Sequence, residues 1–140
     1  MAEITEAAYQ QLRQYIIENW QFIELRDQTN IPIIRLSPDD ERVTWVHQMI
    51  EGEQEIVDYD ELFNPIYGEP KRLLPNTLQL QIVIKGNDPD ITLPQTFAKS
   101  VIYNVPNNGE AISEETFEPF NMQNQNDQLT VIHNIQVPQL

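Results

Sequence analysis

One segment of the chain alternates between apolar and mostly polar side chains. In Thr77–Lys85, every second position is apolar: Leu78, Leu80, Ile82 and Ile84. Because successive side chains of a β-strand point to opposite faces, these four residues share one face of an extended strand. The segment therefore predicts a strand with one buried face, and the fold needs a second layer to cover that face.

Shorter runs with a period of two precede this segment. They span residues 22–26, 31–36 and 42–49, and short polar turns join them. Consecutive strands joined by tight turns are typical of an antiparallel meander, so we expect the three runs to pair in sequence order. Pro32 has no N–H to donate to a ladder, which favours an edge position for the second run or pairing there through its other side.

The C-terminal part of the chain continues the strand pattern. Residues 97–105 form one expected strand, and residues 116–122 are expected to pair with residues 128–137 across the turn at 123–127. One face of the last strand carries Leu129, Val131, His133, Ile135 and Val137. This alternation indicates a second strand with one buried face.

The N-terminal segment has a helical period. From Thr5 to Trp20, apolar side chains recur at spacings of three and four: Ala8, Leu12, Tyr15, Ile16 and Trp20. Thr5 is the expected N-cap, and Glu6 suits the positive end of the helix dipole. A partner-binding or membrane-surface helix has such a stripe too, but the acidic polar face favours packing on the protein's own sheet. We expect Leu12 and Ile16 to contact the alternating strand.

These elements predict the fold class α+β. We expect an N-terminal amphipathic helix packed on a mainly antiparallel β-sheet that forms a sandwich or an open barrel, because six or seven strands need a second face to cover them. The chain has 140 residues, of which 40% are hydrophobic. Residues 1–140 are therefore expected to form a single domain whose core needs no disulfide bonds or structural metal to be stable.

Residues 50–76 interrupt the strand pattern. A connection of this length is uncommon in a compact domain, and such loops tend to be functional or disordered. The first part is acidic, with Glu51, Glu53, Glu55, Asp58, Asp60 and Glu61. Apolar and aromatic residues are more frequent than in a disordered tether, and Pro65, Pro70 and Pro75 stiffen the segment. We expect a long loop inserted between two strands.

The apolar residues of this segment need a surface to cover them. Two surfaces are possible: the protein's own sheet or another chain. We favour another chain, because the acidic residues keep the free protein soluble while the aromatic residues resemble the anchors that dominate interfaces. The expected protein-interface residues are Tyr59, Leu62, Phe63, Ile66 and Tyr67.

The charge of the chain excludes several partner classes. Against 22 acidic residues there are 8 basic ones, so the formal net charge is -14. Affinity for phosphate backbones and anionic lipid headgroups comes mainly from Lys and Arg, so we expect no nucleic acid and no membrane as partner. The start of the chain lacks the basic and apolar regions of a signal peptide, and no apolar run approaches the roughly 20 residues of a membrane span.

No residue set in the chain predicts catalysis. There is no cysteine, no Gly-x-Gly phosphate loop and no Gly-x-Ser-x-Gly elbow. His47 and His133 have no close-spaced ligand motif, so we interpret both as hydrogen-bonded strand histidines. We therefore expect no enzyme, no catalytic residue, no cofactor and no metal ligand.

Two acidic segments approach a calcium loop without completing it. After Asp58 and Asp60, Leu62 stands at the next ligand position and Phe63 stands where the sharp turn needs glycine. Asp88 and Asp90 would make only an irregular site. We interpret both segments as solvated acidic turns.

Four segments of the chain resemble small structural proteins of tailed bacteriophages and prophages. They are residues 22–36 (FIELRDQTNIPIIRL), 40–47 (DERVTWVH), 91–97 (ITLPQTF) and 127–138 (DQLTVIHNIQVP). The resemblance covers most of the chain outside residues 50–76. It implies a non-enzymatic virion component, such as a tail, baseplate or connector protein, and it implies no catalytic residue.

The resemblance also implies partners and a location. The chain would assemble with copies of itself and with other virion proteins, in a virion made in the bacterial host cytoplasm. The residues leave one alternative open, a carbohydrate- or ligand-binding β module with Trp45, Tyr59, Phe63 and Tyr67 as stacking residues. Exposed aromatic residues clustered in a groove would favour that module, whereas a self-complementary patch would favour the virion component.

Overall fold

The computed structural model describes residues 2–137, so the expectations for Met1 and Pro138 lie outside the described residues. A single helix, α1 (Glu6–Asn19), stands at the N-terminal end of this range. The strands are β1 (Phe22–Arg26), β2 (Pro32–Leu36), β3 (Val43–Trp45), β4 (Ile50–Glu51), β5 (Ile56–Tyr59), β6 (Pro65–Tyr67), β7 (Arg72–Leu73), β8 (Thr77–Lys85), β9 (Gln95–Tyr103), β10 (Ser113–Met122) and β11 (Gln128–Gln136).

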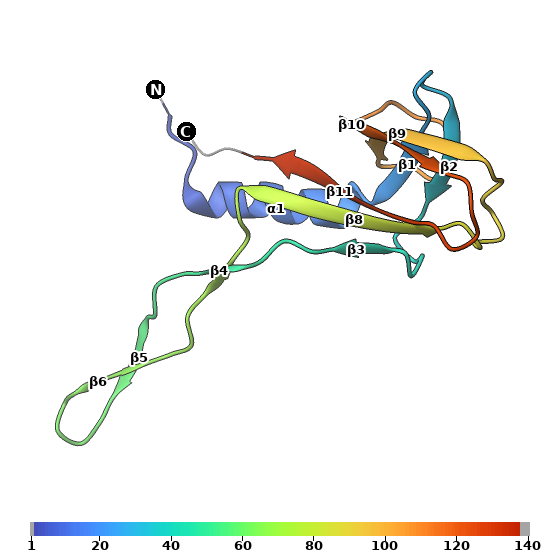
Figure 1. Cartoon of the computed structure of the whole chain (residues 1–140). Helices are drawn as coiled ribbons and strands as arrows, with labels where there is room; N and C mark the ends of the chain where they lie inside the picture. Colours follow the sequence, from blue (N-terminus) through green and yellow to red (C-terminus); the bar gives the residue numbers. More distant parts are fainter. Residues whose placement is uncertain (1, 138–140) are drawn as a thin grey trace.

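Outside residues 50–76, the strands form two antiparallel sheets, which together with α1 we call the body (Figure 1). One has the strand order β10-β9-β1-β2, and the other has the order β11-β8-β3. Leu25 and Ile102 from the first sheet belong to the same buried cluster as Leu80 and Ile82 from the second. The prediction of an N-terminal helix with mainly antiparallel sheets is therefore confirmed, and the sheets form a sandwich-like arrangement rather than a closed barrel.

The alternating segment forms β8, the central strand of its sheet. It pairs with β11 along its whole length and with β3 on its other side. Every second side chain from Leu78 to Ile84 is buried, while the side chains between them are partly exposed. The predicted core face is thus confirmed.

Helix α1 begins as predicted but buries a different face. The Oγ1 of Thr5 accepts a hydrogen bond from the Ala8 N–H at 3.3 Å. Leu12 is 49% exposed, whereas Arg13 and Ile16 are buried. The expected core contact of Ile16 is confirmed, and that of Leu12 is wrong.

Arg13 is the reason for the rotated face. Its guanidinium donates to the carbonyl oxygens of Leu74 and Val137 and to Oδ1 of Asn76. With these acceptors available, the aliphatic stem of Arg13 packs inside beside Tyr9 and Ile16, and Leu12 is turned outward. A fully buried arginine is rare, and the helical spacing of the apolar residues does not indicate one at this position.

Two predicted pairings are wrong because the connections change sheet. β3 pairs with β8 rather than with β2, so the N-terminal meander stops after two strands. β10 pairs with β9, and β11 pairs with β8. A short turn brings consecutive strands close together, but here each turn carries the chain across the sandwich so that both sheets bury their apolar faces. The edge position that Pro32 favours is confirmed, because β2 ends its sheet.

Replacing Leu80 tests the core face. Leu80 is 1% exposed and lies on the shared inner face, so Leu80→Ala should lower the free energy of unfolding by about 2 to 5 kcal/mol through lost burial and a residual cavity. Gln81→Ala, on the opposite face of β8, should change it by less than about 0.5 kcal/mol. Chemical denaturation of both variants measures this, and equal effects would contradict the assignment.

Candidate interaction surface on a projecting arm

Residues 50–76 form an arm of paired strands rather than a loop (Figure 1). The segment lies between β3 and β8. At its base, β4 pairs with β7, with Ile50 opposite Leu73. Farther out, β5 pairs with β6, with Tyr59 opposite Pro65. The arm therefore holds a defined extended shape that carries its tip away from the two body sheets.

Side chains of α1 anchor the base of the arm. The side-chain amide of Gln10 makes two hydrogen bonds with Leu74, accepting from its N–H at 2.7 Å and donating to its carbonyl at 3.0 Å. Arg13 donates to the Leu74 carbonyl and to Asn76 Oδ1, the latter at 2.9 Å. Glu6 lies 3.5 Å from the Arg13 guanidinium. The returning limb is thus fixed to the helix just before it enters β8.

Asp60 organises the tip of the arm. Its Oδ1 accepts hydrogen bonds from the backbone N–H groups of Asn64 at 2.8 Å and Leu62 at 2.9 Å. These bonds, with that from Asn64 foremost, lower the pKa of the Asp60 carboxyl group. Phe63 completes the turn with φ 63°, in the left-handed region. Hairpin turns usually have glycine there, because an L-residue costs about 1–2 kcal/mol in that region.

The predicted interface residues all lie on the outer part of this arm and are exposed. The exposed fractions are 57% for Tyr59, 80% for Leu62, 85% for Phe63, 43% for Ile66 and 54% for Tyr67. Every residue of β5 and β6 is exposed, so these side chains do not dock on the protein's own sheets. Ile56 and Val57 were not among the predicted interface residues, but they are also exposed on β5. They are adjacent apolar residues two and three positions before Tyr59, which was the available signal in the sequence.

Ion pairs on the arm are few. Lys71 Nζ lies 2.7 Å from Glu55 Oε1, and both side chains are largely exposed. Their contact lowers the pKa of the Glu55 carboxyl group and raises the pKa of the Lys71 amine. Because most acidic residues of the arm have no such partner among the ion pairs of the described residues, the arm carries a negative charge beside its apolar side chains.

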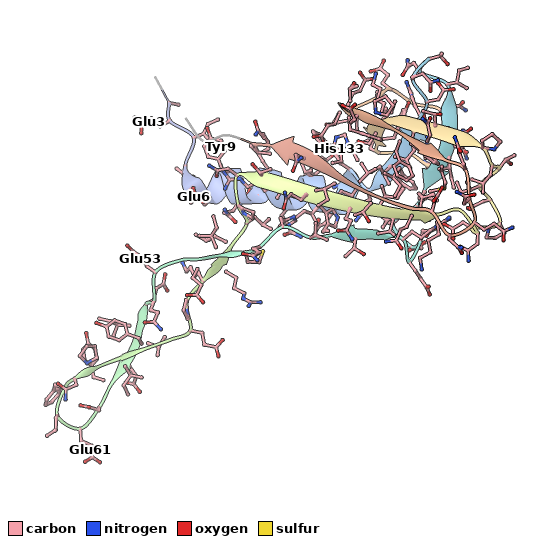
Figure 2. The ribbon with its side chains drawn as sticks, viewed as in Figure 1. Glu3, Glu6, Tyr9, Glu53, Glu61 and His133 are labelled. Carbon is pink, nitrogen blue, oxygen red and sulfur yellow. The ribbon has the colours of Figure 1, made fainter. Side chains whose placement is uncertain are left out.

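Buried His133 connects the two sheets. It lies on β11, and its Nδ1 is 2.7 Å from Ser100 Oγ on β9. Its Nε2 is 2.8 Å from Ser113 Oγ on β10. Figure 2 shows the residue inside the body, and its side chain is 0% exposed. A serine and a histidine in contact suggest nucleophilic catalysis, but His133 and Ser100 are fully buried, so we interpret these hydrogen bonds as structural.

His47 is also hydrogen-bonded within the fold. Its Nδ1 accepts from the Gln79 N–H at 3.3 Å, and its ring lies edge-on to Trp45 with 5.7 Å between centroids. The interpretation as a hydrogen-bonded strand histidine is thus confirmed for His133, whereas His47 is hydrogen-bonded but lies after the end of β3. Among residues 2–137, no group of three or more histidine and carboxylate side chains has the geometry of a metal site.

The acidic turn at Asp88 and Asp90 holds an arginine. Arg42 Nη2 lies 2.8 Å from Asp90 Oδ2 and 2.8 Å from Asp40 Oδ2, and Nη1 lies 3.3 Å from Asp88 Oδ2. The hydrogen bonds from Arg42 lower the pKa of the Asp40 and Asp90 carboxyl groups. A guanidinium therefore occupies the centre where a calcium ion would have to bind, which leaves these carboxylates as a structural cluster.

The four aromatic residues of the ligand-binding alternative do not form one platform. Trp45 lies on β3 and packs against the core cluster. Tyr59, Phe63 and Tyr67 lie on the arm. The structure thus separates one proposed stacking residue from the other three.

The pH dependence of stability tests the role of His133. Burial lowers the pKa of His133 below its usual value near 6.5, although the charge of Glu115 opposes this. A depressed folded-state pKa means that stability is complete above about pH 6.5 and is lost as the pH falls towards the folded-state pKa, by at most about 1.4 kcal/mol per pH unit. We expect His133→Gln to remove this slope between about pH 5 and 7, and His47→Gln to keep most of it. Denaturation curves at each pH measure the slope, and a His133→Gln variant with the wild-type slope would contradict the role.

Comparison of the chain with protein-family models, characterised proteins and solved structures gave no match. Within residues 2–137, helix α1 is too short and too polar to cross a membrane, and no other helix is present there. We therefore base the proposed function on the geometry of the arm and the body.

Proposed function

We propose that the protein is a non-enzymatic structural component of a tailed-bacteriophage virion, such as a tail, baseplate or connector protein. In this proposal, the sheets of the body are a rigid scaffold, and the arm makes contacts with copies of the chain and with other virion proteins. The resemblance of the body segments to such proteins supports the virion assignment. The arm supports the mode of action.

The observation that carries the proposal is the exposure of the arm's apolar residues. Tyr59, Leu62, Phe63 and Tyr67 are each more than half exposed and lie close together in the chain. Clustered exposed apolar residues on a soluble protein mark interaction sites, and aromatic residues dominate binding energy at such sites. An isolated two-stranded hairpin is at best marginally stable in water, so burial in a partner would also stabilise the arm.

The state of the ionisable groups supports a role without catalysis. Two serines hold His133, and Arg42 holds the carboxylates of Asp40 and Asp90. A catalytic acid or base needs access to a substrate and a pKa near the working pH. The depressed pKa of the buried histidine and of these carboxylates fits groups that maintain the fold.

Shortening the arm tests the proposal. Residues 53–70 would be replaced by Asn-Gly, which closes a two-residue hairpin between Gly52 and Lys71. This keeps the bond from the Gly52 N–H to the Lys71 carbonyl and the anchored Leu74. We expect the shortened protein to fold with unchanged core stability and to lose self-association, measured by sedimentation velocity.

A matched control removes exposed apolar side chains elsewhere. Leu12→Ala combined with Tyr15→Ala removes two exposed residues of α1 and should leave association unchanged. A shortened protein that folds and still assembles like the wild type would overturn the role of the arm. The role of the arm would also be overturned if the helix variant abolished assembly and the shortened arm did not.

A further inference from the structure

The arm tip holds an aromatic residue in a costly conformation. Phe63 is the most exposed of the large apolar residues that the structure describes, at 85%. Its φ of 63° suits glycine, which has no Cβ to clash. Phe63 and the adjacent Leu62 lie outside the core cluster, so the fold gains no burial from them. Backbone strain that brings the fold no burial is typical of binding elements. The strained turn holds the Phe63 side chain exposed in advance of binding, as a preformed anchor.

The body contains a cleft that could accept such an anchor. It has a volume of about 310 Å³ and lies between the β1–β2 turn and the edge strand β10. Ala98, Phe117 and Pro119 contribute apolar walls, and Lys99 borders the opening. Asp27 borders it too, but its Oδ1 already accepts three hydrogen bonds from Thr29 and Ile31 within the turn.

A bulge in β10 opens this cleft. Thr116 pairs with Lys99 and Phe120 pairs with Phe97, so β10 has two more residues than β9 over this stretch. Pro119 stands among the extra residues and cannot donate a hydrogen bond to another strand. Bulges and prolines protect an edge from continued sheet pairing, so a partner would bind here through side chains.

The tip and the cleft offer one pair of opposite charges. At the tip, Asp60 is used by the turn, whereas Glu61 is exposed (Figure 2). At the cleft, Lys99 Nζ lies 3.3 Å from Glu114 Oε2, and the Glu114 side chain is 47% exposed. The Lys99 side chain is 21% exposed, and its Nζ also donates to Asn30 Oδ1 at 3.4 Å. An ammonium group has three donors, so Lys99 can contact a second acid beside Glu114 without leaving these partners. In a chain of net charge -14, a lysine beside an apolar cleft favours an acidic partner segment.

We propose that the arm tip of one copy docks in this cleft of a second copy, with Phe63 against Phe117 and Pro119 and with Glu61 beside Lys99. The inference rests on the proposed function and names its contact. The two surfaces differ, so the contact is heterologous, and its repetition produces a ring or a helical array. This geometry fits an assembly component.

Two variants at the tip and the cleft test the contact by sedimentation velocity. Phe63→Gly relieves the turn and removes the anchor, so the arm should become more stable while self-association weakens about 10-fold or more. Lys99→Glu should weaken association about threefold at low salt. Lys85→Glu changes the same charge outside the cleft and serves as the control, with no comparable loss.

A charge exchange gives the decisive comparison. Glu61→Lys alone should weaken association like Lys99→Glu, and the double variant should recover it because the pair is restored with reversed sign. A double variant that is as weak as the single variants, or a Phe63→Gly protein that assembles like the wild type, would overturn this contact. If the shortened arm abolishes assembly in the same series, the proposed function survives and only the cleft assignment fails. If the shortened arm assembles normally, both fail.

Discussion

The inner face of β8 is apolar at four successive inward positions, and the arrangement of the body follows from the need to keep water from it. β11 and β3 pair with the two edges of β8, the opposite sheet covers its face, and Ile16 of α1 joins the same cluster. At about 25 cal/mol per Å² of buried apolar surface, this is the dominant stabilising contribution. His133 supplies the polar connection across the cluster, because its two nitrogens contact serines on β9 and β10.

The arm depends on the same core through its base. Leu74 is buried in the cluster while Gln10 and Arg13 hold its backbone, so the segment that leads from the arm into β8 is fixed on one side by packing and on the other by hydrogen bonds. The Arg13 Nε atom is the one buried side-chain donor without a partner among the described residues. Its cost of roughly 1–3 kcal/mol is offset by the bonds that the other guanidinium nitrogens make. A rigid base lets the outer arm project without collapsing onto the body.

Local patterns predicted the elements better than their partners. The period of β8, the bounds of β1 and the cap at Thr5 depend on neighbouring residues alone, so they could be read from the sequence. The pairing of β3 and β10 depends on which sheet each turn leads to, and no local pattern encodes that. The buried Arg13 needed acceptors that lie far away in the chain. For the arm, composition indicated exposed anchors, but the ladders of β4 to β7 are too short to give a strand period.

Hydrogen exchange of the wild-type protein, measured at low and high protein concentration, tests the central claim most directly. The claim is that assembly buries the outer arm. Amides of residues 56–67 belong to a ribbon with exposed side chains and few long-range contacts, so they should exchange rapidly in the dilute monomer. The account predicts strong protection of these amides at high concentration, with β8 protected at both. Assembly without added protection of residues 56–67 would contradict it.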